Sequence, residues 1–234
     1  MNLKNKQIRA HARHLLDDNV FGWDWIKGAF IHFVMDFVTI GLGRALVKIA
    51  TAFLAVLLVI ASTYNSVLLY GFSIFFLVLA IPLILCAIWG PLSVGAAAVY
   101  IDLVRGDGNI RIRKYFYGFK NFVENTILAV FYVLQVVLWS LFFIIPGIYM
   151  AYSFALVFHV KRDHPEYRWK TCFDESEELM RGNRWKLFKL QISHMGWFLL
   201  SAAFLFIGSY WTLPYYHTSM AIFYEEVRLE KSVR

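Results

Sequence analysis

Residues 49–101 read IATAFLAVLLVIASTYNSVLLYGFSIFFLVLAIPLILCAIWGPLSVGAAAVYI and contain no Lys, Arg, Asp or Glu. A helix needs about 20 apolar residues to cross the hydrocarbon core of a bilayer. This stretch of 53 residues is therefore long enough for two crossings and more. It predicts a helical hairpin in a membrane, with its turn at Ser62–Ser66.

Two further charge-free stretches follow, at residues 125–160 and 190–224. They contain 36 and 35 residues, which is close to two short crossings each. We expect their turns at Pro146-Gly147 and within residues 210–217. The predicted fold is an all-α, polytopic transmembrane helical bundle of about six crossings arranged as three hairpins, plus an amphipathic N-terminal helix.

The composition supports a membrane protein. Hydrophobic residues make up 59% of the chain and charged residues only 17%, whereas soluble domains contain ~45–50% and ~25%. Aromatic residues reach 18%, which fits a lipid-facing surface with aromatic belts at both interfaces. This excess of apolar side chains is too large for one soluble core.

The distribution of charge predicts which side of the membrane each loop faces. The net charge is +7, and residues 105–120 contain five basic residues against one acid. Residues 161–189 contain eight basic residues against six acids. Because cytoplasmic loops carry surplus Lys and Arg, we expect these segments and both termini to face the cytoplasm. The surplus therefore needs no nucleic acid as a partner, and the chain contains no nucleic-acid motif.

This pattern divides a single integral membrane domain, residues 1–234, into seven segments. They are cytoplasmic or interfacial N-terminal helices (1–48), a first hairpin (49–104), a cytoplasmic loop (105–121), a second hairpin (122–160), a cytoplasmic insert with a short amphipathic helix (161–189), a third hairpin (190–224) and a cytoplasmic tail (225–234). Within the first hairpin we expect Trp89-Gly90-Pro91 to break the helix.

Residues 25–48 interrupt the apolar pattern with charged side chains, Asp36 and Arg44 among them. His32, Asp36 and Thr39 lie at helical spacing i, i+4, i+7 and form one polar stripe. We interpret the segment as an interfacial amphipathic helix that leads into the first crossing. The alternative is a full crossing that packs the stripe inside a bundle, where Asp36 would pair with His32 or Arg44.

The cytoplasmic insert predicts a short helix. Thr171 followed by Asp174 approximates a capping box, and Gly182-Asn183 is a plausible helix stop. One interpretation is a surface helix lying along the bilayer. The other is a docking surface for a cytoplasmic partner.

No motif of an enzyme is present: the chain lacks G-x-S-x-G, a P-loop, H-E-x-x-H and G-x-G-x-x-G. His11 and His14 share a helix face, but we expect a solvated basic helix there and no metal site. His194 and His217 lie near the third hairpin and could approach each other. Asp102 is placed to pair with Arg105 at i, i+3. We therefore expect no catalytic residue, no cofactor and no metal.

The second half of the chain contains an ordered set of residues at characteristic distances. The set consists of Ile145-Pro146-Gly147, Tyr152, Ser176, Met180, Gly182, Phe188, Leu190, Ser193, Gly196, Trp197 and Pro214-Tyr215. It resembles a bacterial membrane-protein family catalogued as domain of unknown function 975. The resemblance extends over most of the chain and implies a bacterial cytoplasmic-membrane protein with no assigned activity.

These observations favour a non-enzymatic protein that acts as a scaffold, an assembly partner or an envelope-protection factor in the cell membrane. The alternative is a transporter or lipid-handling protein with a cavity among its helices. We expect membrane lipids as partners, and a protein partner or a homo-oligomer through the helices or residues 161–189. The positions singled out for structure or function are Asp36, Arg44, Pro146, Gly147, Ser176, Gly182, Trp197 and Pro214.

Overall fold

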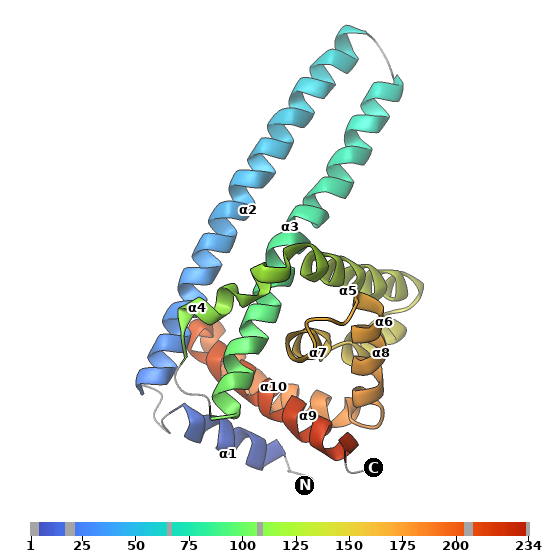
Figure 1. Ribbon diagram of the computed structural model, residues 1–234. Coiled ribbons are helices and arrows are strands. Elements are labelled where there is room, and N and C mark those ends of the chain that lie inside the picture. Colours follow the sequence, from blue (N-terminus) through green and yellow to red (C-terminus); the bar gives the residue numbers. More distant parts are fainter. Residues whose placement is uncertain (1–4, 17–21, 65–66, 107–109, 204–207, 233–234) are drawn as a thin grey trace.

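The computed structural model describes residues 5–16, 22–64, 67–106, 110–203 and 208–232. Helix makes up 90% of the structure, with no strand in the described residues. The all-α prediction is therefore confirmed. The elements are α1 (Asn5–Leu15), α2 (Trp23–Thr63), α3 (Val67–Val104), α4 (Ile112–Tyr115), the 3₁₀ helix η1 (Phe116–Asn121), α5 (Phe122–Phe142), α6 (Ile144–Ser153), α7 (Val157–Asp163), α8 (Trp169–Met180), α9 (Arg184–Ala203) and α10 (Ser209–Ser232), as Figure 1 shows.

Helices α2 and α3 form a long hairpin that projects beyond the rest of the molecule (Figure 1). Its turn follows Thr63, as predicted. Residues 25–48 form the first part of α2, which continues without a break to Thr63, and their interfacial position stays a prediction. Large apolar side chains in the distal half of the hairpin are exposed, among them Phe53, Val59, Leu68, Phe72 and Phe75. A surface of this kind needs an apolar environment.

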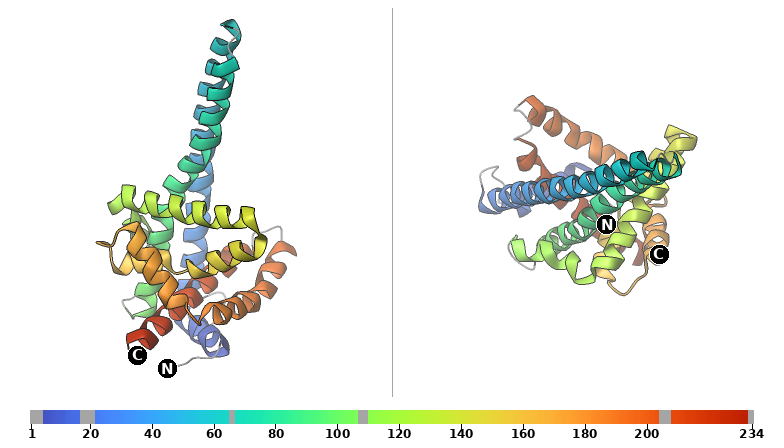
Figure 2. Two further views of the ribbon diagram at one scale, coloured as in Figure 1. Left: turned by 90° about the vertical axis from the view of Figure 1, so that its right-hand side faces the viewer. Right: turned by 90° about the horizontal axis from the view of Figure 1, so that it is seen from above.

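Four helical segments among the described residues are long and apolar enough to cross a membrane. They are Trp23–Ile60, Val67–Val104, Ile112–Phe142 and Ile144–Asp163. Helices α5 and α6 pack against each other, and α5 crosses α3 near Gly90 instead of running along the α2–α3 hairpin (Figure 2). Six crossings in three parallel hairpins therefore stay a prediction.

The structure differs from the expected turns and helix breaks at three places, and each place contains a proline. Helix α3 continues through Pro91, so no break occurs at Trp89-Gly90-Pro91. Pro214 lies inside α10, so residues 210–217 are helical. The α5–α6 turn is at Phe143, whose backbone is extended, and Pro146 lies in the first turn of α6. The missing N–H of a proline costs nothing there, because the first N–H groups of a helix have no partner within the helix.

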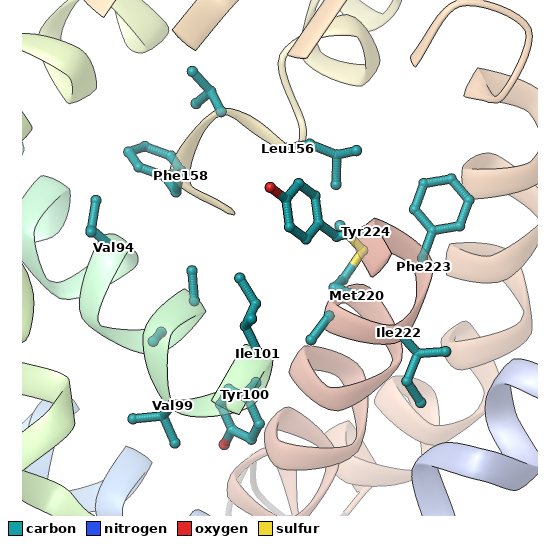
Figure 3. Packing of buried hydrophobic residues seen from close by; sticks show 14 of the residues in the cluster. Val94, Val99, Tyr100, Ile101, Leu156, Phe158, Met220, Ile222, Phe223 and Tyr224 are labelled. Atoms are coloured by element: carbon teal, nitrogen blue, oxygen red, sulfur yellow. The ribbon is translucent and has the colours of Figure 1, made fainter. Parts of the chain in front are cut away.

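The core lies where α3, α7 and α10 meet. Figure 3 shows Tyr100 and Ile101 of α3 on one side of the cluster and Phe223 and Tyr224 of α10 on the other, with Leu156 next to Tyr224. Each of these side chains is at most 1% exposed. Burial on this scale stabilises by roughly 1.5–3 kcal/mol for each large apolar side chain.

The helix predicted in the cytoplasmic insert is present as α8, which begins two residues before Thr171. Gly182 follows it with a φ of +83°, in the left-handed region that favours glycine. The expected Asp102–Arg105 pair is wrong. Asp102 pairs with Lys114 and Arg162, whereas Arg105 pairs with Asp163 and Glu225, because the fold brings the end of α3 against α4, α7 and α10.

Candidate functional site

A cavity of about 320 Å³ lies among α2, α3, α7 and α10. Cavities that hold small ligands typically have volumes of ~300–1,000 Å³. Its lining combines apolar side chains with imidazole, phenol and carboxyl groups. The lining residues are His32, Met35, Asp36, Thr39, Trp89, Leu92, Ser93, Ala96, Ala97, Tyr115, Tyr132, Ala155, Phe158, His159, Tyr216, His217 and Met220.

One wall of the cavity is a hydrogen-bonded cluster around His32. The Nε2 atom of His32 lies 2.8 Å from the Tyr100 hydroxyl and 3.0 Å from the Tyr115 hydroxyl. His32 is 7% exposed, and the two tyrosines are at most 2% exposed. Buried polar groups of this kind are satisfied by each other and hold one geometry. The cluster therefore fixes α2, α3 and α4 relative to one another.

A second imidazole, from α10, stacks on this cluster. The ring of His217 lies 5.0 Å from the His32 ring and 5.3 Å from the Tyr100 ring, measured between centroids. Both ring pairs are close to parallel, at 13° and 11°. The polar side chains of α2 and α10 thus meet inside the bundle.

The third imidazole, His159 of α7, is 9% exposed, and its Nδ1 atom has no hydrogen-bond partner among the described residues. A buried polar atom left unpaired costs about 1–3 kcal/mol. His159 lines the cavity. The cavity lining therefore includes a buried, polar imidazole ring.

Asp36 reaches the same cavity from α2 and is half-buried. Within the described parts of the chain it forms no ion pair with His32 or Arg44, so the expected pairing is wrong. His32 is engaged by the two tyrosines, and Arg44 lies about two turns further along α2, exposed. The polar stripe His32–Asp36–Thr39 does face the interior, as the second interpretation of residues 25–48 required.

Among the residues that the structure describes, no group of three His, Cys, Asp or Glu side chains could hold a metal ion. His194 is also separate from His217: it packs on Tyr215 and lies 3.2 Å from the Ser219 hydroxyl. The chemistry available in the cavity is therefore hydrogen bonding, ring stacking and the Asp36 carboxyl group.

The other predicted site residues lie outside this cavity. Gly147 packs against Ser140 where α5 and α6 meet, next to Pro146. The buried Ser176 hydroxyl donates a hydrogen bond to the Ser153 carbonyl oxygen at 3.0 Å.

Near the amino terminus of α10, Trp197 packs edge-on against Tyr215. Pro214 packs against Gly28. These positions hold helices together and do not converge on one site.

Only the polar stripe within residues 25–48 indicated this cavity in the sequence. Tyr100, Tyr115, His159 and His217 are scattered over four elements and share no spacing. Only the fold brings them together.

Comparison with known proteins agrees with the resemblance noted above. The comparison with curated proteins and the comparison with solved structures each found no match. A family model described as "Protein of unknown function (DUF975)" matches residues 145–231, from the first turn of α6 to the end of α10. Most of the residues that carry the resemblance lie within this match. The matched segment also supplies His159, Tyr216 and His217 to the lining of the cavity. Over residues 145–231, this chain is similar to that family of unknown function.

Proposed function

We infer that this protein is a non-enzymatic, multi-pass protein of the bacterial cytoplasmic membrane that binds a small or lipidic ligand in the cavity, as a transporter or lipid-handling protein. The observation that carries this proposal is the cavity itself, whose lining combines the buried imidazole of His159 with the carboxyl group of Asp36 among mostly apolar side chains. A protein that only joined helices together would fill such a space with apolar side chains.

The lining indicates the class of ligand. Trp89, Phe158 and Met220 offer apolar and aromatic surface, whereas His159 and Asp36 offer hydrogen bonds. Sites of this composition hold amphipathic molecules, because the apolar walls bury most of the ligand and a few polar groups orient it. A ligand with an apolar body and one hydrogen-bonding end fits both parts of the lining.

Native mass spectrometry of the full chain, extracted from its membrane in a mild detergent, tests this proposal. We expect a mass adduct that survives purification. A Ser93→Phe variant, which fills the cavity from α3, should lose it, and Thr39→Phe repeats the test from α2. Ser62→Phe introduces the same ring at an exposed position of α2 and should keep the adduct.

The proposal is wrong if the wild-type protein carries no adduct, or if a folded cavity variant keeps it. Size-exclusion elution and the melting temperature report whether each variant is folded. The two cavity variants change different helices, so a folding defect in one leaves the other informative.

A scaffold or assembly partner is the second candidate function. The observation in its favour is the α5–α6 turn, where five consecutive apolar side chains, Leu141–Ile145, are each at least 73% exposed. Such a patch marks a contact with lipid or with another protein. A stoichiometric partner or a homo-oligomer that native complexes lose on Phe143→Asp substitution would support the scaffold. Complexes without any partner would exclude it.

A further inference from the structure

A second pocket, of about 880 Å³, opens between the end of α3, the α4–η1 segment and the end of α7. It shares no lining residue with the cavity described above. Its lining contains five basic side chains, two acids and two aromatic rings. The lining residues are Ala98, Asp102, Arg111, Arg113, Lys114, Phe116, Tyr117, Lys120, Arg162, Asp163 and Pro165.

The two acids of this pocket are already neutralised. The Asp102 carboxylate accepts hydrogen bonds from Lys114, at 2.6 Å, and from Arg162. The Asp163 carboxylate accepts hydrogen bonds from Arg105, at 2.6 Å and 3.0 Å, and from Arg162, at 2.6 Å. Neither acid is left to balance a further positive charge.

Three cations of the pocket remain uncompensated. Arg111, Arg113 and Lys120 form no hydrogen bond and no ion pair with any residue that the structure describes, and all three are exposed. Three like charges on one pocket wall repel each other. An anion bound between them would relieve this repulsion and gain charge-assisted hydrogen bonds.

The segment that carries these cations is fixed to α3. A Cβ on Gly118 would overlap the Pro91 carbonyl oxygen, so η1 lies directly on the helix. The Asn125 Nδ2 atom donates to the Gly118 carbonyl oxygen at 2.5 Å. Because their backbone is held this way, only the side chains of the three cations, and not the segment itself, must be ordered when they bind a ligand.

The location of the pocket indicates what kind of anion it meets. It lies at the last turns of α3 and just before α5, the ends of two helices that are able to cross a membrane. Phe116 and Tyr117 line it and are 52% and 38% exposed. Aromatic and basic side chains gather at the depth of the lipid phosphates, and basic pockets between helices bind anionic headgroups there.

We propose that Arg111, Arg113 and Lys120 form a binding site for a phosphate group. The oxygens of a phosphate match the planar donor fork of an arginine, which binds them in pairs, while a lysine supplies a point charge. The phosphate belongs to an anionic phospholipid headgroup or to a soluble phosphate compound, and both present the same anionic oxygens.

The test uses the full chain in a neutral detergent and two probes. Short-chain phosphatidylglycerol, against phosphatidylcholine, is added in mixed micelles, and inorganic phosphate is titrated by calorimetry. The triple variant R111Q/R113Q/K120Q should weaken binding of the recognised probe by at least about tenfold, since a loss of 1.4 kcal/mol is enough for that factor. The R111K/R113K variant keeps the charge but loses the paired donors. Its affinity for the probe should therefore lie between those of the wild-type protein and the triple glutamine variant.

The matched control is R168Q/K170Q/R181Q, which removes the same charge from exposed cations in and beside α8. It should bind within about twofold of the wild-type protein. Circular dichroism and size-exclusion elution confirm that each variant is folded. If the triple glutamine variant is unfolded, the R111K/R113K variant is compared with the wild-type protein and the control in its place.

The outcomes separate the two sources of phosphate. Selective binding of phosphatidylglycerol that inorganic phosphate does not displace assigns a lipid headgroup. Binding of inorganic phosphate without preference for either lipid assigns a soluble compound. Equal weakening by both triple variants would show attraction to surface charge alone and overturn the proposal. No preference for phosphatidylglycerol together with no binding of phosphate would also overturn it.

Discussion

The backbone of Gly95 on α3 lies directly against the carbonyl group of Tyr115 at the end of α4, and a Cβ on Gly95 would overlap that oxygen. The same Tyr115 places its hydroxyl 3.0 Å from His32 in the cavity wall. Because Gly95 has no side chain, α4 can approach α3 closely, and this approach sets the position of the Tyr115 hydroxyl in the cavity wall. The run Gly95–Ala98 packs closely, as small residues allow in membrane helices.

Gly95→Ala should destabilise the protein by about 1–3 kcal/mol or more, because α4 must move away from α3. Thermal unfolding in detergent, followed by fluorescence-detected size exclusion, measures this as a lower melting temperature. Gly71→Ala on the same helix is the control. A Cβ there meets no atom within 4 Å, so it should be neutral or stabilise by up to ~1 kcal/mol. Equal melting temperatures for both variants would contradict the close contact.

Asp163→Asn should destabilise the protein by about 3–5 kcal/mol, because its side chain is 6% exposed and pairs with Arg105 and Arg162. The amide cannot balance the two guanidinium groups. Chemical unfolding in detergent measures the loss. Glu166→Gln makes the same change at a side chain that is 66% exposed and should leave the unfolding midpoint close to that of the wild-type protein. A small effect at Asp163 would show that these ion pairs do not hold α3 to α7.

Cys172 should react slowly with a maleimide at pH 8. Burial raises the pKa of its thiol from 9.0 to about 11, so only ~0.1% is thiolate at that pH. A Cys86→Ala background isolates it, because both cysteines are free. A cysteine at the exposed Lys170, with both native cysteines replaced, is the fast control. Rapid labelling of Cys172 in the folded protein would contradict its burial.

The same thiol makes stability depend on pH. Its pKa is raised in the folded protein, so folding favours the protonated form. This contribution is complete below pH 9 and is lost as the pH rises through about 11. The melting temperature of the Cys86→Ala protein should therefore fall more steeply above pH 9 than that of the Cys86→Ala/Cys172→Ala double variant. Parallel curves for the two proteins would contradict this.

The predicted sidedness can be tested in intact cells with single cysteines on a cysteine-free background. A cysteine at Thr63, in the α2–α3 turn, should react with an impermeant maleimide from outside. One at Lys170 should react only after permeabilisation. Cytoplasmic labelling at Thr63 would overturn the first hairpin. A cysteine at Phe143 then shows whether the α5–α6 turn also reaches the outer face.

Helix ends that depend on the local pattern of residues could be predicted from the sequence. Helix α2 ends at Thr63, where polar residues separate two apolar runs, and α8 ends just before Gly182. The capping box expected at Thr171 and Asp174 is wrong, because α8 begins at Trp169, with Arg168 as its N-cap and no side-chain cap hydrogen bond. The turns placed at Pro146-Gly147 and within residues 210–217 were wrong. A proline lacks an N–H group, but it ends a helix only where that group is needed or where no neighbour supports the chain.

The sequence by itself determined that the chain is helical and apolar enough for a membrane, because hydrophobic length and charge are local properties. The same charge pattern also predicted which face is cytoplasmic. Only the tertiary structure brought His32, His159 and His217 around one cavity. It also left Arg111, Arg113 and Lys120 without counter-charges in the described part of the chain, because Asp102 and Asp163 pair with other residues. Such partners are set by packing between distant segments, and no spacing along the chain encodes them.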